Sequence, residues 1–269
     1  MTFHNASKPA MNWHRFKKLG ISTSLLLMLL VLISSCSKTT TSSATQYGTI
    51  SLQFQSQIAG HNIDTIGKFY TDSLGRRISL NLAQFYFCGV ILHQANGATY
   101  VVPGVYGLNT LQSGSISLGQ VPVGDYTSIT VNIGVDAAAN AVSSAGYPAT
   151  NPLSPQSPPM WFGNTVQGFE FVNIQGSVDT TVNGTGTGNK IIPISYQVGT
   201  NALLRSITLT GQTLTIGLNQ NLNVNFVCDY GKLLSVVNFK TNPSATPFTS
   251  NSAVATAIAN QEQAFLRYK

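Results

Sequence analysis

Side chains able to do acid–base, nucleophilic or metal chemistry are few in this 269-residue sequence, and they are widely spaced. Only two of its four histidines, His61 and His93, lie beyond the first 35 residues, and neither belongs to an HxxxH pair or a CxxC companion. The sequence has no GxSxG motif. Its eight acidic residues form no paired motif: Asp64, Asp72, Asp125, Asp136, Glu170, Asp179, Asp229 and Glu262. These residues predict a protein that is not an enzyme.

The three cysteines occur in two settings. Cys36 follows a hydrophobic run near the N-terminus, whereas Cys88 and Cys228 lie in strand-like sequence. In an oxidising compartment, Cys88 and Cys228 could form a disulfide that ties an early strand to a late one. Two inward-facing strand cysteines that never meet are also compatible with the sequence, and the distance between their Cα atoms decides between the two.

The first 35 residues predict a secretory signal peptide. Arg15, Lys17 and Lys18 precede an apolar run at residues 21–33, which is shorter than the roughly 20 apolar residues that span a bilayer. The run ends in Ile33-Ser34-Ser35-Cys36, which resembles a bacterial lipobox. Cys36 would then become the lipidated N-terminus, with enough acyl chains for stable membrane attachment. An ordinary signal peptide followed by a chance cysteine is the alternative.

Residues 36–46 read as a short polar tether, rich in Ser and Thr, between the lipid and the domain. The tether has no acidic cluster of the kind that acts as a surface-export signal in some Gram-negative lipoproteins. We therefore expect a cell-envelope protein anchored in the outer membrane, with the periplasmic face favoured over the cell surface.

Most of the net positive charge of the chain comes from the predicted signal peptide. The formal net charge is +6, but four of the 14 basic residues precede the apolar run, and residues 36–269 carry ten basic and eight acidic residues. A nucleic-acid partner would need clustered Lys and Arg, which this nearly neutral chain does not supply. We expect no nucleic-acid binding.

The elements that must position these residues are predicted to be strands. Period-two apolar spacing and many turn residues favour an all-β domain over residues 47–269, an Ig-like or jelly-roll-like β-sandwich. Residues 85–92 are continuously apolar and predict a central strand buried on both faces. Residues 136–167 form a long Pro-rich loop, and residues 252–266 form one C-terminal helix after an Asn251 cap. The other predicted strands contain residues 50–54, 78–82, 129–133, 192–198 and 222–230.

Several fragments, in order, resemble the MbnP-like domain of methanobactin-associated copper-binding proteins. They include Ile133-Gly134-Val135-Asp136 with Asn140, then Met160-Trp161, Gly168-Phe169-Glu170-Phe171, and Tyr196-Gln197-Val198-Gly199. The resemblance implies a secreted or lipid-anchored β-sandwich that binds copper. In some members copper is held by histidines and by a tryptophan oxidised to kynurenine, and a partner dihaem cytochrome of the MauG type performs that oxidation.

The resemblance departs from the family pattern at the ligands. Gln197 stands where the family has histidine, and Gln175 stands where it has glutamate. The remaining candidates for a copper site are Asp136, Asn140, Trp161 and Gln197. A neutral amide is a poor copper ligand beside imidazole. Asp136 and Asn140 have an alternative interpretation as turn and loop-anchoring residues, and Trp161 one as an apolar plug that packs the loop on the core.

Two functions remain open. The first is a lipid-anchored protein that binds copper or is the substrate of a partner dihaem cytochrome. The second is a non-catalytic binding or adhesion module that has lost the metal site. A carbohydrate is one ligand for such a module, suggested by the neighbouring aromatic residues Trp161 and Phe162.

Overall fold

The structure, a computed structural model, describes residues 44–112, 114–181 and 184–269. The predicted signal peptide, Cys36 and most of the tether lie outside these residues. The chain divides into two units, and the second, Thr45–Lys269, is the one described here. No helix within the described ranges is long and apolar enough to cross a membrane.

Two β-sheets form the domain, which confirms the predicted β-sandwich. The smaller sheet has the order β14-β12-β1-β2, and β7 also pairs with β1. Its two long strands, β1 and β12, run parallel, with Phe54 opposite Phe226. The strands of this sheet are β1 (Tyr47–Ile58), β2 (His61–Asn62), β7 (Ile116–Pro122), β12 (Asn221–Asp229) and β14 (Leu266–Tyr268).

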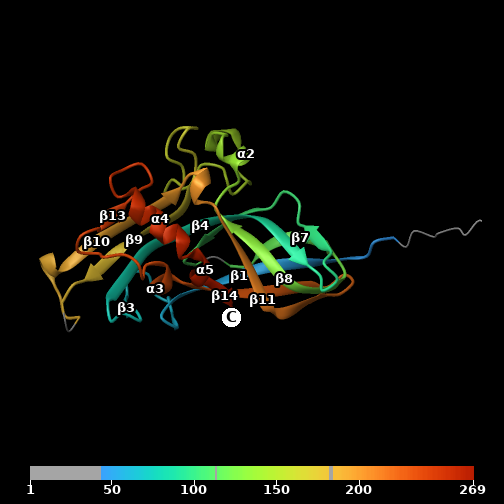
Figure 1. Ribbon diagram of the computed structural model, residues 1–269, viewed down its shortest axis with the longest axis horizontal. Helices are drawn as coiled ribbons and strands as arrows, with labels where there is room; N and C mark the ends of the chain where they lie inside the picture. Colours follow the sequence, from blue (N-terminus) through green and yellow to red (C-terminus); the bar gives the residue numbers. More distant parts are fainter. Residues whose placement is uncertain (1–43, 113, 182–183) are drawn as a thin grey trace, which may run out of the picture. The chain divides into compact units, whose positions relative to one another are not determined.

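The larger sheet is organised by one long strand, β4 (Arg77–His93), which crosses the domain in Figure 1. β4 includes the continuously apolar stretch at residues 85–92, which is buried almost throughout, as predicted. The strand order is β11-β8-β4-β9-β10-β13, with β3, β5 and β6 also paired to β4. The other strands are β3 (Phe69–Thr71), β5 (Thr99–Val101), β6 (Tyr106–Thr110), β8 (Gly124–Ile133), β9 (Glu170–Asp179), β10 (Ile191–Gly199), β11 (Arg205–Ile216) and β13 (Ser244–Ala245).

β8 and β9 pair with the same edge of β4, one after the other along its length. Both run antiparallel to β4: β8 ends with Ile133 opposite Phe87, and β9 pairs Val172 with Phe85. Between these points the chain leaves the sheet for residues 134–169 and then returns to it. β10 and β11 repeat the pattern, since β10 pairs with β9 and β11 with β8. We call the gap between the two halves the seam of the larger sheet.

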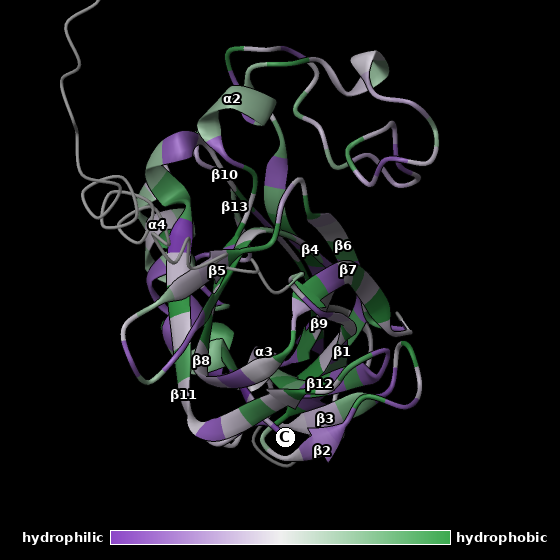
Figure 2. Ribbon diagram, turned by 90° about the vertical axis from the view of Figure 1, so that its right-hand side faces the viewer, coloured by the Kyte–Doolittle hydropathy of each residue, from purple (hydrophilic) through white to green (hydrophobic). Residues whose placement is uncertain are grey.

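Apolar side chains from both sheets meet in the main core. The ring centroid of Phe54 on β1 lies 5.4 Å from that of Phe85, 5.2 Å from that of Phe87 and 5.5 Å from that of Phe226. Gly107 permits this packing, because a Cβ there would lie 2.1 Å from the Phe87 ring. Strands at the margin alternate instead, as β11 does in Figure 2, with one face buried and one exposed.

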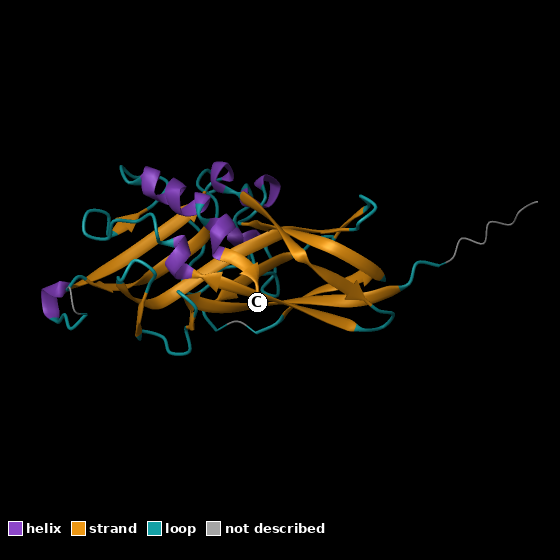
Figure 3. Ribbon diagram, turned by 60° about the horizontal axis from the view of Figure 1, so that its bottom comes forward, coloured by secondary structure: helices purple, strands orange, loops and turns teal. Residues whose placement is uncertain are grey.

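Short helices cap the strands rather than forming a layer of their own (Figure 3). The predicted C-terminal helix is α4 (Ser252–Asn260), followed after Gln261 by one turn of α5 (Glu262–Phe265). Asn251 is its N-cap residue, although the Asn251 side chain donates to the Ser244 carbonyl at 3.0 Å and makes no cap bond. The other helical turns of the described residues are α2 (Ala137–Asn140), α3 (Tyr230–Leu233) and the 3-10 turns Ser144–Gly146, Gly188–Lys190 and Asn201–Leu203.

Cys88 and Cys228 are both buried and both free, so the disulfide considered from the sequence is not formed. Cys228, on β12, belongs to the main core between the sheets. Cys88 lies on β4 next to Phe87, and the Phe87 side chain also faces that core. Because successive strand side chains point to opposite faces, the Cys88 thiol faces away from the smaller sheet. Burial raises the pKa of the Cys88 thiol to about 11, so it stays protonated at neutral pH.

Candidate functional site

Residues 134–169 fold over the outer face of the larger sheet with a hydrophobic core of their own. In Figure 1 this loop rises beside β4 and carries α2. Its satellite core, as we call it, comprises seven buried residues: Tyr86, Val135, Ala139, Leu153, Met160, Phe169 and Phe171. The predicted Pro-rich loop is therefore an ordered cover on the sheet, and the seam lies beneath it.

Asp136 begins α2 and is fully engaged there. Its Oδ1 accepts from the backbone amides of Ala138 and Ala139, at 3.0 and 3.1 Å, and its Oδ2 accepts from the Tyr106 hydroxyl. Burial raises the pKa of Asp136, but the hydrogen bonds from Tyr106 and the two amides outweigh burial and leave the pKa below its ordinary value. The carboxylate is thus ionised and acts as a helix cap.

Asn140 ties the loop to the seam. Its Oδ1 accepts from the Phe169 backbone amide at 2.7 Å, and its Nδ2 donates to Asn201 Oδ1 at 2.9 Å. Gly168 has a φ of +74°, and a Cβ there would lie 2.3 Å from Asn140 Oδ1. Glycine is thus required beside Asn140. The Asn140 amide joins the two connections that interrupt the sheet.

Trp161 packs on the satellite core while staying partly accessible. Its ring centroid lies 4.8 Å from that of Phe169 in an edge-to-face arrangement, and an isolated β-bridge joins the same two residues. A small cavity of about 130 Å³ lies beside it, lined in part by Tyr86 and Met160. Trp161 therefore packs the loop onto the sheet and also borders an opening.

Glu170 is the centre of a buried polar cluster at the start of β9. Its Oε1 accepts from Gln197 Nε2 at 2.8 Å, and its Oε2 accepts from Asn173 Nδ2 at 2.6 Å. Gln175 Nε2 donates in turn to Asn173 Oδ1 at 3.3 Å. We call these four residues the amide–carboxyl cluster. A register shift between β9 and β10 beside Gly199 turns Glu170 to the same face as Asn173.

The Glu170 carboxyl has no cation among its hydrogen-bond partners. Burial raises the pKa of Glu170 to about 7, and the bonds from Gln197 and Asn173 limit the rise. Both forms of the group are thus populated near neutral pH. An amide can donate through its NH₂ or accept through its oxygen, so the same partners can satisfy either the carboxylate or the carboxylic acid.

The donors gathered here do not fit copper. Copper prefers imidazole and sulfur ligands, whereas this cluster offers neutral amides and a carboxyl that is half protonated near neutrality. Within residues 44–112, 114–181 and 184–269, no three His, Cys, Asp or Glu side chains lie close enough to hold a metal. Gln84 of β4 pairs with Asn173 of the cluster, and His93 lies nine residues further along β4, about 30 Å away. His93 Nε2 is hydrogen-bonded there to Thr130 Oγ1 at 2.8 Å.

The four candidates taken from the sequence are not brought together by hydrogen bonds. Among the described residues, no hydrogen bond joins the side chains of any two of Asp136, Asn140, Trp161 and Gln197. Gln197 instead donates to Glu170, an acid that belongs to one of the matching fragments but is not among the four candidate ligands. Period-two alternation groups Asn173 with Gln175 but assigns Glu170 to the opposite face, so no local pattern could have found this contact before the register shift was known.

These features define a class of protein: a β-sandwich whose larger sheet is interrupted by an ordered loop that covers buried polar residues. The chain belongs to the MbnP family, whose model matches residues 47–251. Among solved structures it is similar to MbnP from Methylosinus trichosporium, with 14% identity over 72% of this chain and 79% of that one and a TM-score of 0.47. A comparison with curated proteins gave no match.

Proposed function

We propose that the mature protein is a lipid-anchored binding module of the cell envelope that performs no catalysis and does not hold copper in the way the family resemblance implies. The observation that carries the proposal is the hydrogen bond from Gln197 Nε2 to Glu170 Oε1, 2.8 Å long. A position expected to supply an imidazole instead supplies an amide that is already committed to a buried carboxyl. The Gln197 side chain is therefore not available as a copper ligand of the kind that the family resemblance implies.

Copper titration of the purified mature chain tests this proposal. Wild type is expected to take up no stoichiometric Cu(I) or Cu(II) at micromolar protein, while Gln197→His is expected to gain affinity because imidazole is the better ligand. Gln175→His, on the neighbouring strand, is the matched control for a histidine added nearby. Stoichiometric copper on the wild-type chain would overturn the proposal.

The anchor is a separate part of the proposal and rests on Cys36 and the apolar run before it. Cys36→Ala should release the protein from the membrane fraction and abolish incorporation of labelled fatty acid, since no acyl chain could then be attached. Ser35→Ala, which keeps the cysteine, is the control. Retention of the Cys36→Ala protein in the outer membrane would contradict lipid anchoring.

A second candidate is a protein that serves as the substrate of a partner dihaem cytochrome. The partial exposure of Trp161 beside a cavity favours it, because an oxidant outside the protein could withdraw electrons from this ring. Intact mass and peptide mapping of the protein from its native host would test it. An unmodified Trp161 in protein produced beside the cytochrome would exclude this role.

A further inference from the structure

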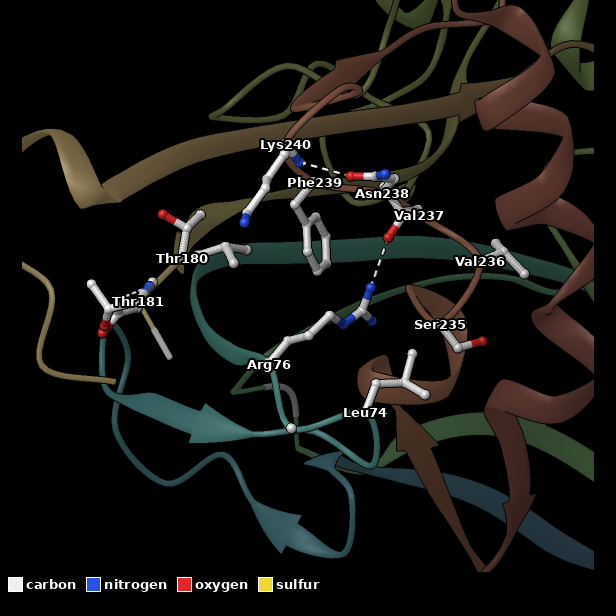
Figure 4. Close-up of a pocket in the computed structure, with 13 residues that line it drawn as sticks. Leu74, Arg76, Thr180, Thr181, Ser235, Val236, Val237, Asn238, Phe239 and Lys240 are labelled. Carbon is white, nitrogen blue, oxygen red and sulfur yellow. Dashed lines mark hydrogen bonds between the residues drawn. The ribbon is translucent and has the colours of Figure 1, made fainter. Parts of the chain in front are cut away.

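A second, separate cavity of about 550 Å³ lies at the other end of the larger sheet, away from the loop of residues 134–169. It is lined by residues 74–76 before β4, residues 178–181 at the end of β9, and the segment 235–240 that follows α3 (Figure 4). Its volume falls within the range of sites that hold small organic ligands. No part of the amide–carboxyl cluster lines it.

Arg76 builds the floor of this cavity but is not free to bind a ligand anion. Its guanidinium bonds to the buried Asp72 carboxylate and to the carbonyls of Leu234 and Val237, at 3.0 and 2.7 Å. It also stacks 4.4 Å from the Phe239 ring. Arg76 therefore fixes the segment at residues 234–239, and its charge is balanced by Asp72.

Most polar side chains of the wall are also engaged. The hydroxyls of Thr180, Thr181 and Ser235 donate to neighbouring groups. Hydrogen bonds from Thr181 lower the pKa of Asp179 to about 2, and Arg77 pairs with this carboxylate at 3.0 Å. The negative charge nearest the cavity is thus already neutralised.

Lys240 is the exception. None of the ion pairs formed by the described residues includes it. In Figure 4 its side chain extends from the loop toward the space between Thr180 and Phe239. The Asn238 side chain lies beside it and accepts the Lys240 backbone amide through Oδ1, which leaves its NH₂ as a donor. The charged amine of Lys240 therefore faces the cavity.

The opposite rim is apolar and exposed. Leu74 is 60% exposed and Val236 is 46% exposed, and both line the cavity. We propose that this cavity binds an amphiphilic monocarboxylate, whose carboxylate meets Lys240 and whose apolar chain covers Leu74 and Val236. A free medium-chain acid and the C-terminus of a peptide with an apolar last residue share this chemistry.

Calorimetric titration of the mature protein with octanoate, and with a tripeptide that ends in leucine, tests the assignment. The ligand that binds more tightly indicates whether the natural carboxylate belongs to a free acid or to a peptide C-terminus. Octanamide and the amidated tripeptide are the matched partners that lack the carboxylate. Because one charge-assisted hydrogen bond is lost, each is expected to bind about tenfold more weakly. Lys240→Met should produce a similar loss with the acids and little change with the amides.

Two matched variants complete the test. Lys232→Met removes an exposed lysine that does not line the cavity and should bind as wild type does, while Lys240→Arg should retain binding. Leu74→Ser should weaken binding severalfold, since apolar area at the rim is lost. The assignment is overturned if neither acid binds saturably at millimolar concentration, or if Lys240→Met and Lys232→Met behave alike.

Discussion

Two buried carboxyl groups are almost equally inaccessible to solvent, but one is paired with a cation and the other with neutral amides. Asp72 is 5% exposed and lies against a cation, with Arg76 Nε 2.7 Å from its Oδ2. Glu170 is 4% exposed and meets only the neutral amides of Gln197 and Asn173. Two carboxyl groups that are buried to the same extent can therefore have different electrostatic surroundings, a cation in one case and neutral amides in the other.

The two carboxyls also differ in what they join. The Asp72–Arg76 pair ties the turn before β4 to the carbonyls of Leu234 and Val237, so it has a structural role. The Glu170 group lies at the seam, beneath a loop with its own small core. A carboxyl that changes charge near neutral pH is found where the sheet is interrupted, and a carboxyl paired with an arginine is found where distant segments are held together.

The largest effect on stability is expected at the Asp72–Arg76 ion pair. Arg76→Met leaves the buried Asp72 carboxylate without its cation, which should lower the free energy of unfolding by about 3–5 kcal/mol. Urea denaturation measures this change. Adding Asp72→Asn to Arg76→Met should recover part of the loss, because no buried charge then remains. A single variant as stable as wild type would show that the pair contributes nothing.

The next effect concerns Glu170 and depends on pH. The pKa of this carboxyl in the folded protein is about 7, above its ordinary value of 4.5, so the folded state holds a proton that the unfolded state releases between these values. The stability it contributes is present below pH 4.5 and is lost as pH rises through 7, by about 3 kcal/mol in total. Glu170→Gln should remove that slope from the stability profile, and parallel profiles for the two proteins would contradict the assignment.

A smaller effect is expected at the amide donor. Gln197→Met keeps the length of the side chain but removes the hydrogen bond to Glu170, so the pKa of Glu170 should rise further. The free energy of unfolding should fall by about 1–2 kcal/mol at pH 8 and by less at pH 5, where the carboxyl is protonated in either protein. Gln175→Met is the control, since its amide reaches Asn173 rather than Glu170. Equal effects of the two substitutions would count against the cluster as described.

The smallest effect separates the loop from the sandwich. The Tyr86 hydroxyl donates to the Pro152 carbonyl at 3.1 Å, so Tyr86→Phe should cost about 1 kcal/mol. We expect the loss in the loop, as faster hydrogen exchange at residues 137–168 with unchanged exchange in β1 and β12. Uniformly faster exchange in all strands would mean that the loop and the sandwich open as one unit.

The fold could be predicted further than the site. Alternation at residues 50–54 or 129–133 is a local pattern with a period of two, so strands and the sandwich followed from it. Gln197 was also singled out, as a glutamine in place of a histidine. Its partner Glu170 was not, because the contact depends on the pairing of β9 with β10 and on the register shift beside Gly199. Register across strands is set by turns and packing far from either residue.

The same limit explains the cysteines. Cys88 and Cys228 both lie in strand sequence. Nothing local indicates that the Cys228 side chain points into the core between the two sheets, whereas the Cys88 side chain points to the outer face of the larger sheet, which the loop of residues 134–169 covers. That distinction required knowledge of which face of β4 is the inner one.

The interrupted sheet has a consequence for how such domains diversify. Ile133 and Val172 pair with residues of β4 only two positions apart, so the ends of the loop lie within about 7 Å along the strand. Loop length adds little entropic cost when the ends are already held by the sheet. The scaffold can thus accept insertions, deletions or whole exchanges between these points without a change in its strands, and the same junction offers a grafting site for protein engineering.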